Sequence, residues 1–443
     1  MPSTGLDRSY RALFRVPSMA RIVAGMQIAR IGQSMVSVAM VLFTLTAYHS
    51  AELAGLVTFV AIVPGMLVSP IAGALLDRHG RSRLVLVDYT VAGLSLALIG
   101  GLALAGELPV WALLLIAGIS SLTAPLSSTG LRSLFPLLVP MPLWERINAV
   151  DSMGYVMATI VGPPLAGLVV GLWGGPAAMV VIALTYAIAA IVLIGIPDPR
   201  TDVASTGRLL LDAWQGLGYT WRNPTLRALG FSISAINLSG GVTTIVIPLI
   251  VLDRLHRGPA TVGAVFAVMG VGGGVAALVF GRMNSAGRER RMLVLPMLAS
   301  AAALLLLLPE QLALMVASMT LIGLLNGPMD IGMFTLRQRR TDPAWMGRAF
   351  AVSMSFNFAG FPIGSAIAGW LAARSIPGAI AFGAVACVMA GVIAARGIPD
   401  ADGEGHDAPG QVVSTSPAPG GLSPALAGHA GRPGGSCSFW EIC

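Results

Sequence analysis

Long apolar runs, separated by short polar segments, dominate the chain. Twelve runs are long enough for a helix of about 20 residues to cross the hydrocarbon core of a bilayer. The longest polar interruption covers residues 197–224 and leaves six runs on either side. The pattern predicts an all-α membrane protein with twelve transmembrane helices in two six-helix bundles. The runs centre near Gln33, Pro64, Ser95, Thr123, Val161, Ala187, Asn237, Gly270, Ala301, Gly323, Phe361 and Ala384.

The same pattern predicts how the chain is divided. We expect a cytoplasmic N-terminal segment (1–17), a first bundle (18–196), a cytoplasmic linker (197–224) and a second bundle (225–398). Residues 399–443 are rich in Gly, Pro, Ser and Ala and have no hydrophobic pattern. Such a composition cannot bury enough apolar surface to fold, so the tail is expected to be disordered.

Composition supports the membrane interpretation. The chain is 55% hydrophobic and 11% charged, whereas soluble domains carry about 25% charged residues. All 27 basic residues are Arg, so a phosphate-binding lysine loop is excluded and no ATP-driven step is expected. The three cysteines form neither a disulfide framework nor a metal pattern. We therefore expect no metal and no cofactor.

The arginines alternate from loop to loop. Nearly all lie in one set of loops, and the opposite loops contain Arg254, Arg257 and Arg374. Basic residues accumulate on the cytoplasmic side of membrane proteins. The net charge of +7 is therefore a signal of topology, with both termini cytoplasmic, and does not indicate nucleic-acid binding. The cell (plasma or inner) membrane is the expected location.

The two halves share an internal similarity. Residues 149–167 match residues 351–369 at a constant spacing of 202, including Gly162 with Gly364 and Gly167 with Gly369. Chance similarity between helices rich in Gly and Ala is one explanation. The other is a parallel repeat, as in the two halves of some secondary transporters.

The loop after the second run, GALLDRHGRSR (73–83), carries a recognisable motif. Glycine at the first position allows close helix packing, and an aspartate at a helix C-terminus requires a positive partner. The loop resembles the signature of the major facilitator superfamily. By that resemblance we expect a conformational-switch loop, although an ordinary basic loop remains an alternative. Its residues are Gly73, Asp77, Arg78, Gly80, Arg81 and Arg83, with Ser82 at the usual last basic position.

The fifth run contains Gly162, Pro163, Pro164 and Gly167, which resemble the Gly-Pro motif of the antiporter branches. Two adjacent prolines remove two backbone donors and bend a helix, so a purely structural kink is the alternative. Residues 133–140, 147–167 and 346–369 resemble the branch that includes macrolide and enterobactin exporters. The resemblance implies transport of a small molecule across the lipid bilayer, with protons as the coupling ion.

Polar residues inside the runs are candidates for substrate and coupling sites, because a charge at membrane depth is costly. They are Gln27, Arg30, Ser34, Asn237, Asn326 and Asp330. Asp330 can exchange a proton, whereas Arg30 cannot, so we assign coupling to Asp330 and substrate or counter-ion contact to Arg30. Arg30 pairing with an acid, or Asp330 bracing a helix end, are the alternatives. Asp88 and Asp151 are expected to pair with loop arginines.

These features favour a proton-coupled exporter of a small amphipathic compound such as an antibiotic, siderophore or other secondary metabolite. The second candidate is an uptake symporter or facilitator for a small metabolite. A polytopic membrane enzyme is a third, opposed by the five histidines, which all lie in loops or in the tail. We therefore expect a transporter that is not an enzyme.

The arginine pattern generates a prediction of topology. In a variant whose natural cysteines are replaced by serine, Glu107→Cys should react with a membrane-impermeant thiol reagent added to intact cells. Arg81→Cys should react only after the membrane is permeabilised. Labelling of Arg81→Cys but not Glu107→Cys in intact cells would show the opposite orientation.

Overall fold

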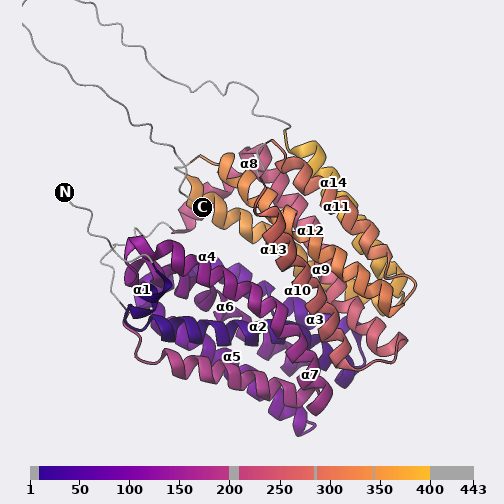
Figure 1. The fold of residues 1–443 in the computed structure, drawn as a ribbon. Coiled ribbons are helices and arrows are strands. Elements are labelled where there is room, and N and C mark those ends of the chain that lie inside the picture. The colour runs from indigo at the N-terminus through magenta and orange to yellow at the C-terminus, as the bar shows by residue number, and fades with distance from the viewer. Residues whose placement is uncertain (1–8, 199–208, 284–286, 343–344, 400–443) are drawn as a thin grey trace, which may run out of the picture. The chain divides into compact units, whose positions relative to one another are not determined.

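The computed structural model describes residues 9–198, 209–283, 287–342 and 345–399, and all regular elements in these ranges are helices (Figure 1). They belong to the part of the chain that ends at Ala401. The helices are α1 (Tyr10–Arg15), α2 (Met19–Tyr48), α3 (Ala51–Val60), α4 (Val63–His79), α5 (Arg81–Leu104), α6 (Val110–Leu138), α7 (Trp144–Leu193), α8 (Leu209–Arg222), α9 (Pro224–Leu249), α10 (Pro259–Phe280), α11 (Glu289–Leu305), α12 (Leu312–Arg339), α13 (Met346–Ala372) and α14 (Ile376–Gly397).

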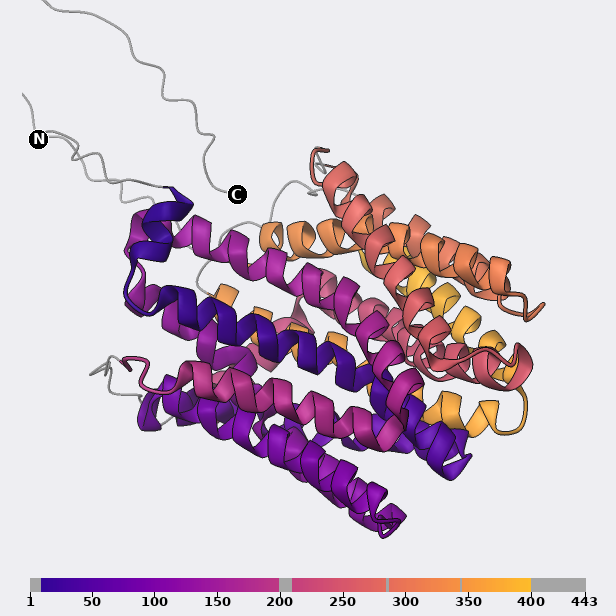
Figure 2. The same ribbon diagram turned by 60° about the horizontal axis from the view of Figure 1, so that its bottom comes forward.

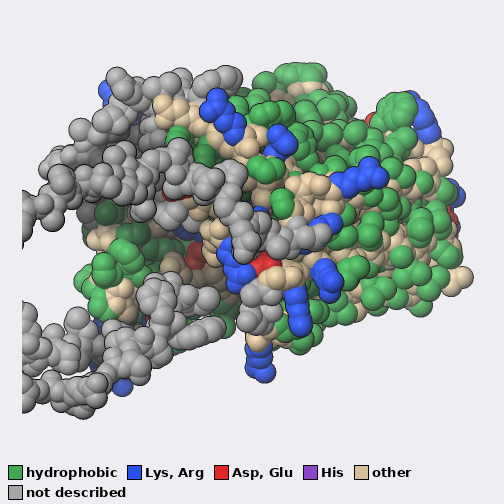
Figure 3. Space-filling model, turned by 90° about the horizontal axis from the view of Figure 1, so that it is seen from above, with side chains coloured by type: hydrophobic (Ala, Val, Ile, Leu, Met, Phe, Trp, Pro, Cys, Tyr) green, Lys and Arg blue, Asp and Glu red, His purple; other side chains and the backbone are tan. Residues whose placement is uncertain are grey.

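The outer surface is apolar, as expected for a protein surrounded by lipid. Nine helical segments in the described ranges are long and apolar enough to cross a membrane. Large side chains such as Leu67, Leu94 and Leu278 are two-thirds or more exposed, and Figure 3 shows hydrophobic side chains over much of one face. Exposed apolar surface on this scale marks contact with a membrane. The chain is therefore a membrane protein, and the helix arrangement is consistent with the twelve predicted spans.

Helix α7 contains two of the predicted spans. Its backbone leaves the helical conformation at Gly174, where φ is +82° and ψ is 167°. Before this point Gly154 and Gly162 pack against Gln27 and Ser34 of α2, so the two helices run in the same direction. After it the order reverses, because Gly32 contacts Thr185 whereas Gly25, earlier in α2, contacts Leu193. Gly174 is thus a tight reversal between two antiparallel arms.

The second predicted span is divided into α3 and α4. Helix α3 ends at Val60, and α4 begins at Val63 with Pro64 in its first turn. A proline in a first helical turn leaves no required hydrogen bond unmade. The next amide, Gly65 N–H, donates to Ser121 Oγ of α6 at 3.2 Å, so the start of α4 is joined to a neighbouring helix.

The two bundles are built around equivalent central pairs. In the first bundle α2 packs against both arms of α7, and α5 lies against α6 and α7. In the second, α9 packs against α13 and α14, while α12 lies against α10 and α11. Helices α7 and α13 begin at residues 144 and 346, the same spacing of 202 found in the sequence. The positions of these helices support the parallel-repeat interpretation.

The bundles approach each other closely at two glycine contacts. A Cβ atom on Gly167 of α7 would lie 2.5 Å from the Pro259 carbonyl oxygen of α10, and a Cβ on Gly369 of α13 would lie 2.5 Å from the Ala51 carbonyl oxygen of α3. Gly263 and Gly55 are the partners in these contacts. Figures 1 and 2 show the bundles converging near α3 and α10 and diverging towards the end where α1 lies.

The polar linker predicted at residues 197–224 contains helix α8. Tyr219 of α8 stacks on Trp345, with ring centroids 5.1 Å apart, and Asn223 donates to the Arg340 carbonyl at 2.9 Å. These contacts join the linker to the second bundle. Residues 199–208 and the predicted tail from residue 400 onward lie outside the described residues, and the domain boundaries remain predictions.

The close contact between α7 and α10 should tolerate no side chain at Gly263. A Cβ there would lie 2.5 Å from the Pro163 carbonyl oxygen, and overpacking a close contact costs about 1–3 kcal/mol. Gly263→Leu should therefore lower the apparent Tm of the detergent-purified protein. Gly101→Leu in α5 is the control, because a Cβ at Gly101 would meet nothing within 4 Å. Equal Tm values for the two variants would contradict the packing argument.

Candidate functional site

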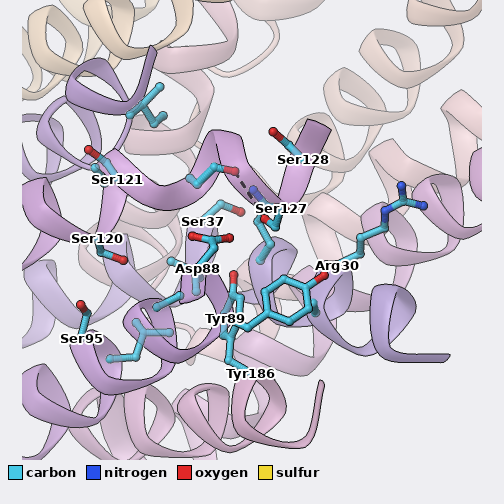
Figure 4. Close-up of a pocket in the computed structure, with 18 of the residues that line it drawn as sticks. Arg30, Ser37, Asp88, Tyr89, Ser95, Ser120, Ser121, Ser127, Ser128 and Tyr186 are labelled. Carbon is cyan, nitrogen blue, oxygen red and sulfur yellow. Dashed lines mark hydrogen bonds between the residues drawn. The ribbon is translucent and has the colours of Figure 1, made fainter. Parts of the chain in front are cut away.

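A cavity of about 350 Å³ lies mainly in the first bundle. Its walls come from α2, α3, α5, α6 and α7, and Thr244 of α9 and Phe361 of α13 complete it. Much of the wall consists of small and hydroxyl side chains, which leave space that larger residues would fill. Figure 4 labels the serine residues among these: Ser37, Ser95, Ser120, Ser121, Ser127 and Ser128.

Asp88 of α5 is the acidic residue that lines this cavity. The residue is 4% exposed, and the side chains of Ser127 and Thr123 on α6 lie within hydrogen-bonding reach of its carboxyl group. Figure 4 shows it beside Ser127, with Tyr89 and Tyr186 below it. Within the described residues Asp88 forms no salt bridge. The expectation that it pairs with a loop arginine was therefore wrong: α5 begins at Arg81, which places Asp88 two turns inside the bundle.

A second charged cluster lies where α2, α6 and α7 meet. Arg30 donates to one Asp151 carboxylate oxygen at 2.5 Å and to the Asp151 backbone carbonyl at 2.8 Å. Arg132 Nε donates to the other carboxylate oxygen at 3.0 Å. Both guanidinium groups lie over the ring of Tyr155, at 5.2 and 5.8 Å from its centroid. One carboxylate and one aromatic face thus hold two cations.

This cluster shows the partners of Arg30 and Asp151, and substrate contact by Arg30 stays a prediction. Arg30 pairs with an acid inside the bundle, and it also lines the cavity. Asp151 pairs with Arg132, one of the arginines of the predicted cytoplasmic loops, as well as with Arg30. The Arg30 and Asp151 side chains are 12% and 9% exposed, so the ion pair that they form is buried.

The other candidates on α2 have packing positions. Gly154 of α7 lies against the Gln27 amide, and Gly162 lies against Ser34, where an added Cβ would meet Ser34 Cβ at 2.5 Å. Neither Gln27 nor Ser34 lines the cavity. Arg30 is therefore the one predicted substrate or coupling residue that the structure brings to this cavity.

The candidates of the second bundle lie apart from the cavity. Asn237 of α9 donates to the Asn357 carbonyl of α13 at 2.7 Å. The buried Asn357 amide in turn lies between the Ser353 carbonyl and Arg337 Nη2, at 3.0 and 2.6 Å. Asn326 is half-buried on α12, and Asp330 is exposed one turn later. The structure does not bring Asn237, Asn326 or Asp330 to the cavity.

The predicted switch loop forms the turn between α4 and α5. Gly80 has φ +95°, a conformation that favours glycine, and a Cβ there would lie 2.5 Å from Asp198 Oδ2. The same oxygen accepts the Ser82 backbone N–H at 3.0 Å. A carboxylate in this position stabilises the positive N-terminus of α5. The sequence did not predict a role for Asp198. It follows the sixth run, and the arginine pattern places this segment on the same side of the membrane as the loop after the second run.

The remaining loop residues are described unevenly. Gly73, Asp77 and Arg78 belong to α4, and Arg81 and Arg83 belong to α5. Arg78 and Arg83 are exposed, whereas Arg81 is half-buried. The structure does not describe the surroundings of Gly73 or the side chain of Asp77. The partner expected for Asp77 therefore stays a prediction.

The Gly-Pro motif lies inside the first arm of α7, which continues through Pro163 and Pro164 as helix. Gly162 faces Ser34 of α2, and Gly167 faces Gly263 of α10. The motif thus lies between the partner helix of its own bundle and the other bundle. Gly162 allows α7 to lie close to α2, and Gly167 allows it to lie close to α10.

The sequence interpretation missed Asp88, Tyr89 and Tyr186 as residues of one site. Tyr89 and Tyr186 come from α5 and the second arm of α7, and their rings meet edge to face with centroids 5.9 Å apart. The available signal was Asp88 itself, an acid inside an apolar run. It was discounted because three basic residues at positions 78, 81 and 83 lie nearby.

The chain matches the model of a known protein family. The model of the Major Facilitator Superfamily matches residues 22–242 and 228–427. A relative from Sinorhizobium fredii, the uncharacterized MFS-type transporter y4rN, is 37% identical over 86% of this chain and 95% of its own length. The multidrug efflux pump Tap of Mycolicibacterium fortuitum is 27% identical over 73% of this chain and 81% of its own. Macrolide efflux protein A of Streptococcus pyogenes is 22% identical, over 80% and 89%.

Solved structures with the same fold include transporters of different kinds. The nucleoside transporter NupG aligns with a TM-score of 0.66 at 13% identity, over 86% of this chain and 96% of its own. A bacterial homologue of the iron transporter ferroportin, in an inward-facing state, aligns with a TM-score of 0.66 at 16% identity, over 85% and 97%. At these identities the likeness concerns the fold alone.

The shared position of Asp151 predicts a large effect of its removal. Breaking a buried ion pair by deleting one partner costs about 3–5 kcal/mol, and Asp151→Ala leaves Arg30 without its carboxylate. We expect a clear fall in the apparent Tm of the purified protein. Glu145→Ala is the control, because Glu145 meets Arg146 at 3.7 Å with its side chain 65% exposed, where a pair is worth less than about 1 kcal/mol. Similar Tm changes in the two variants would rule out a structural role for the cluster.

Proposed function

The chain belongs to the Major Facilitator Superfamily and is a membrane transporter rather than an enzyme, and from this premise we propose that it is a proton-coupled exporter of a small amphipathic compound. Two relatives with 22–27% identity are named as efflux proteins. Those names describe the relatives, and they support export here as the first candidate. Antibiotics, siderophores and other secondary metabolites are the compounds to which the proposal refers.

The observation that carries the proposal is the composition of the cavity wall. Serine hydroxyls, tyrosine rings and small apolar residues surround a space of about 350 Å³. Ligand pockets combine apolar and aromatic walls with a few polar groups that fix orientation. Such a wall suits a molecule with both apolar and polar faces. Thr244 and Phe361 of the second bundle also reach the cavity, so a movement of one bundle against the other would change access to it.

The bundle contacts support alternating access by rocking. The glycine contacts of Gly167 with Gly263 and of Gly55 with Gly369 close the approach on one side of the cavity. Glu52 of α3 and Arg374, which follows α13, form an ion pair of 2.8 Å at the same end. The α4–α5 turn, with its arginines, lies at the opposite end of the first bundle. If that end is cytoplasmic, as the arginine pattern predicts, the structure corresponds to an inward-facing carrier.

Coupling to protons requires a group that can bind and release one. Asp330, exposed on α12, is the residue that we propose for this role. Arg30 remains charged throughout, and its bonds to Asp151 support a role in holding the cavity wall and its charge. Substrate contact by Arg30 remains part of the proposal, because its side chain lines the cavity.

Uptake is the second candidate function, because the fold is shared with a nucleoside transporter. The two candidates differ in the direction of movement, which one assay separates. In inside-out membrane vesicles energised with a proton gradient, an exporter accumulates substrate within the vesicle lumen. In right-side-out vesicles under an inward proton gradient, an importer does so.

We expect inside-out vesicles containing the wild-type protein to accumulate a labelled amphipathic drug that is small enough for the cavity of about 350 Å³, and a protonophore to abolish the accumulation. Asp330→Asn should lose gradient-driven accumulation but retain exchange of labelled for unlabelled drug. Glu107→Gln, an exposed loop residue, is the matched carboxyl-to-amide control and should behave as wild type. Uphill accumulation by Asp330→Asn would exclude its coupling role, and accumulation only in right-side-out vesicles would favour uptake.

A further inference from the structure

We propose that the cavity binds an organic cation and that the carboxylate of Asp88 holds its positive group. The inference rests on the proposed transport function and specifies the chemical class of its substrate. It is carried by the position of Asp88, by the aromatic side chains beside it and by the separate arginine cluster in the same cavity wall.

Asp88 is a buried acid that has no ion-pair partner among the described residues. Its neighbours Ser127 and Thr123 supply hydroxyl groups, which can donate hydrogen bonds but carry no charge. Within the described part of the chain no arginine forms an ion pair with it. A buried carboxylate is costly unless it is paired, and Asp88 lies among the residues that line the cavity (Figure 4). A ligand cation entering the cavity would provide the missing charge.

The aromatic residues next to Asp88 suit the same ligand. Tyr89 and Tyr186 are 3% and 8% exposed and both line the cavity. Their rings meet edge to face, which fixes their orientation beside the carboxyl group. An aromatic face attracts a cation electrostatically when the charge lies within about 6 Å of the ring centroid. The Asp88 carboxylate and the two tyrosine rings can therefore each attract the positive group of a ligand.

The arginines do not reverse this preference. Arg30 and Arg132 line the cavity, but both are bound by Asp151 and both lie over Tyr155. Figure 4 shows the Arg30 guanidinium pointing away from Asp88. An anionic ligand at the arginine end would leave Asp88 uncompensated. A cation at Asp88 satisfies the carboxylate and can direct carbonyl or hydroxyl oxygens towards the arginines, so an amine with polar acceptors fits both ends.

The size of the cavity limits the ligand. Its volume of about 350 Å³ is near the lower end of the roughly 300–1,000 Å³ found for ligand pockets. Small side chains such as Ala92, Ala117 and Ala124 form part of the wall and leave room for aromatic groups on the ligand. A compact amphipathic amine or quaternary cation is therefore the expected class.

The test uses two probes of similar shape and different charge. Methyltriphenylphosphonium carries a permanent positive charge and exchanges no proton, whereas triphenylphosphine oxide, with an oxygen in place of the methyl group, is neutral. Binding of each to the purified full-length protein is measured by equilibrium dialysis. Wild type should bind the cation at least about tenfold more tightly, because a charged partner strengthens an interaction by roughly that factor. A wild type that does not prefer the cation overturns the proposal.

The variants assign the preference to Asp88. Asp88→Asn keeps the size of the side chain and removes its charge, so the Kd of the cation should rise about 10- to 100-fold while that of the neutral probe changes less than about threefold. Asp88→Glu should retain the cation preference, and Glu107→Gln should match wild type. Unchanged cation binding in Asp88→Asn, or an equal loss for both probes, overturns the assignment.

Transport in the same vesicles separates this inference from the proposed function. If inside-out vesicles accumulate neutral or anionic drugs but not cationic ones, export is supported and the cation site is excluded. If Asp88-dependent cation binding is present but no drug accumulates in inside-out vesicles, the binding site is supported and export is excluded. Cation accumulation that Asp88→Asn abolishes, at an unchanged apparent Tm, supports both.

Discussion

The structure depends on backbone-to-backbone contact between its two halves. In lipid, helices gain little from hydrophobic burial, so they associate through small residues that allow close packing. Gly167 meets Pro259 and Gly263, and Gly369 meets Ala51 and Gly55. Gly167 and Gly369 are related by the 202-residue spacing of the sequence. Because each contact leaves no space for a side chain, these positions determine which helices of the two bundles meet and at which end. The divergence of the bundles towards the other end follows from them.

The buried charges of the first bundle differ in whether they are paired. Asp151 forms ion pairs with two arginines, Arg30 and Arg132. Without these partners, burial of its carboxylate would be unfavourable. The cluster joins α2, α6 and α7, three helices that also surround the cavity, so the same ion pairs that hold the wall together define one charged end of the site. Asp88 lies within hydrogen-bonding reach of hydroxyl groups. The cavity wall thus contains an ion-paired cluster and an acid that forms no salt bridge within the described residues.

The two bundles are related in architecture and differ in chemistry. Gly162 of α7 packs on α2 much as Gly364 of α13 packs on α9. Three polar residues of the second bundle, however, lie together: Asn237 binds the Asn357 carbonyl, and the Asn357 amide lies beside Arg337. The cavity accordingly lies mainly in the first bundle, with Thr244 and Phe361 as contributions from the second. The repeat of the fold is thus not matched by a repeat of the cavity wall.

The sequence by itself determined the fold class, the membrane environment and the family, because these depend on properties that add along the chain. The length of the apolar runs and the lack of Lys can be read directly from the chain. The spacing of Gly162 from Gly364 is periodic, and the motif at Gly80 and Arg81 is contiguous. Only the tertiary structure decided which polar residues share a site. Gln27 and Ser34 lie within one helical turn of Arg30, yet they pack against α7, while Asp88 and Tyr186, 98 residues apart, line one cavity. The direction in which a side chain points depends on the rotation of its helix against its neighbours, and close glycine contacts between distant segments set that rotation.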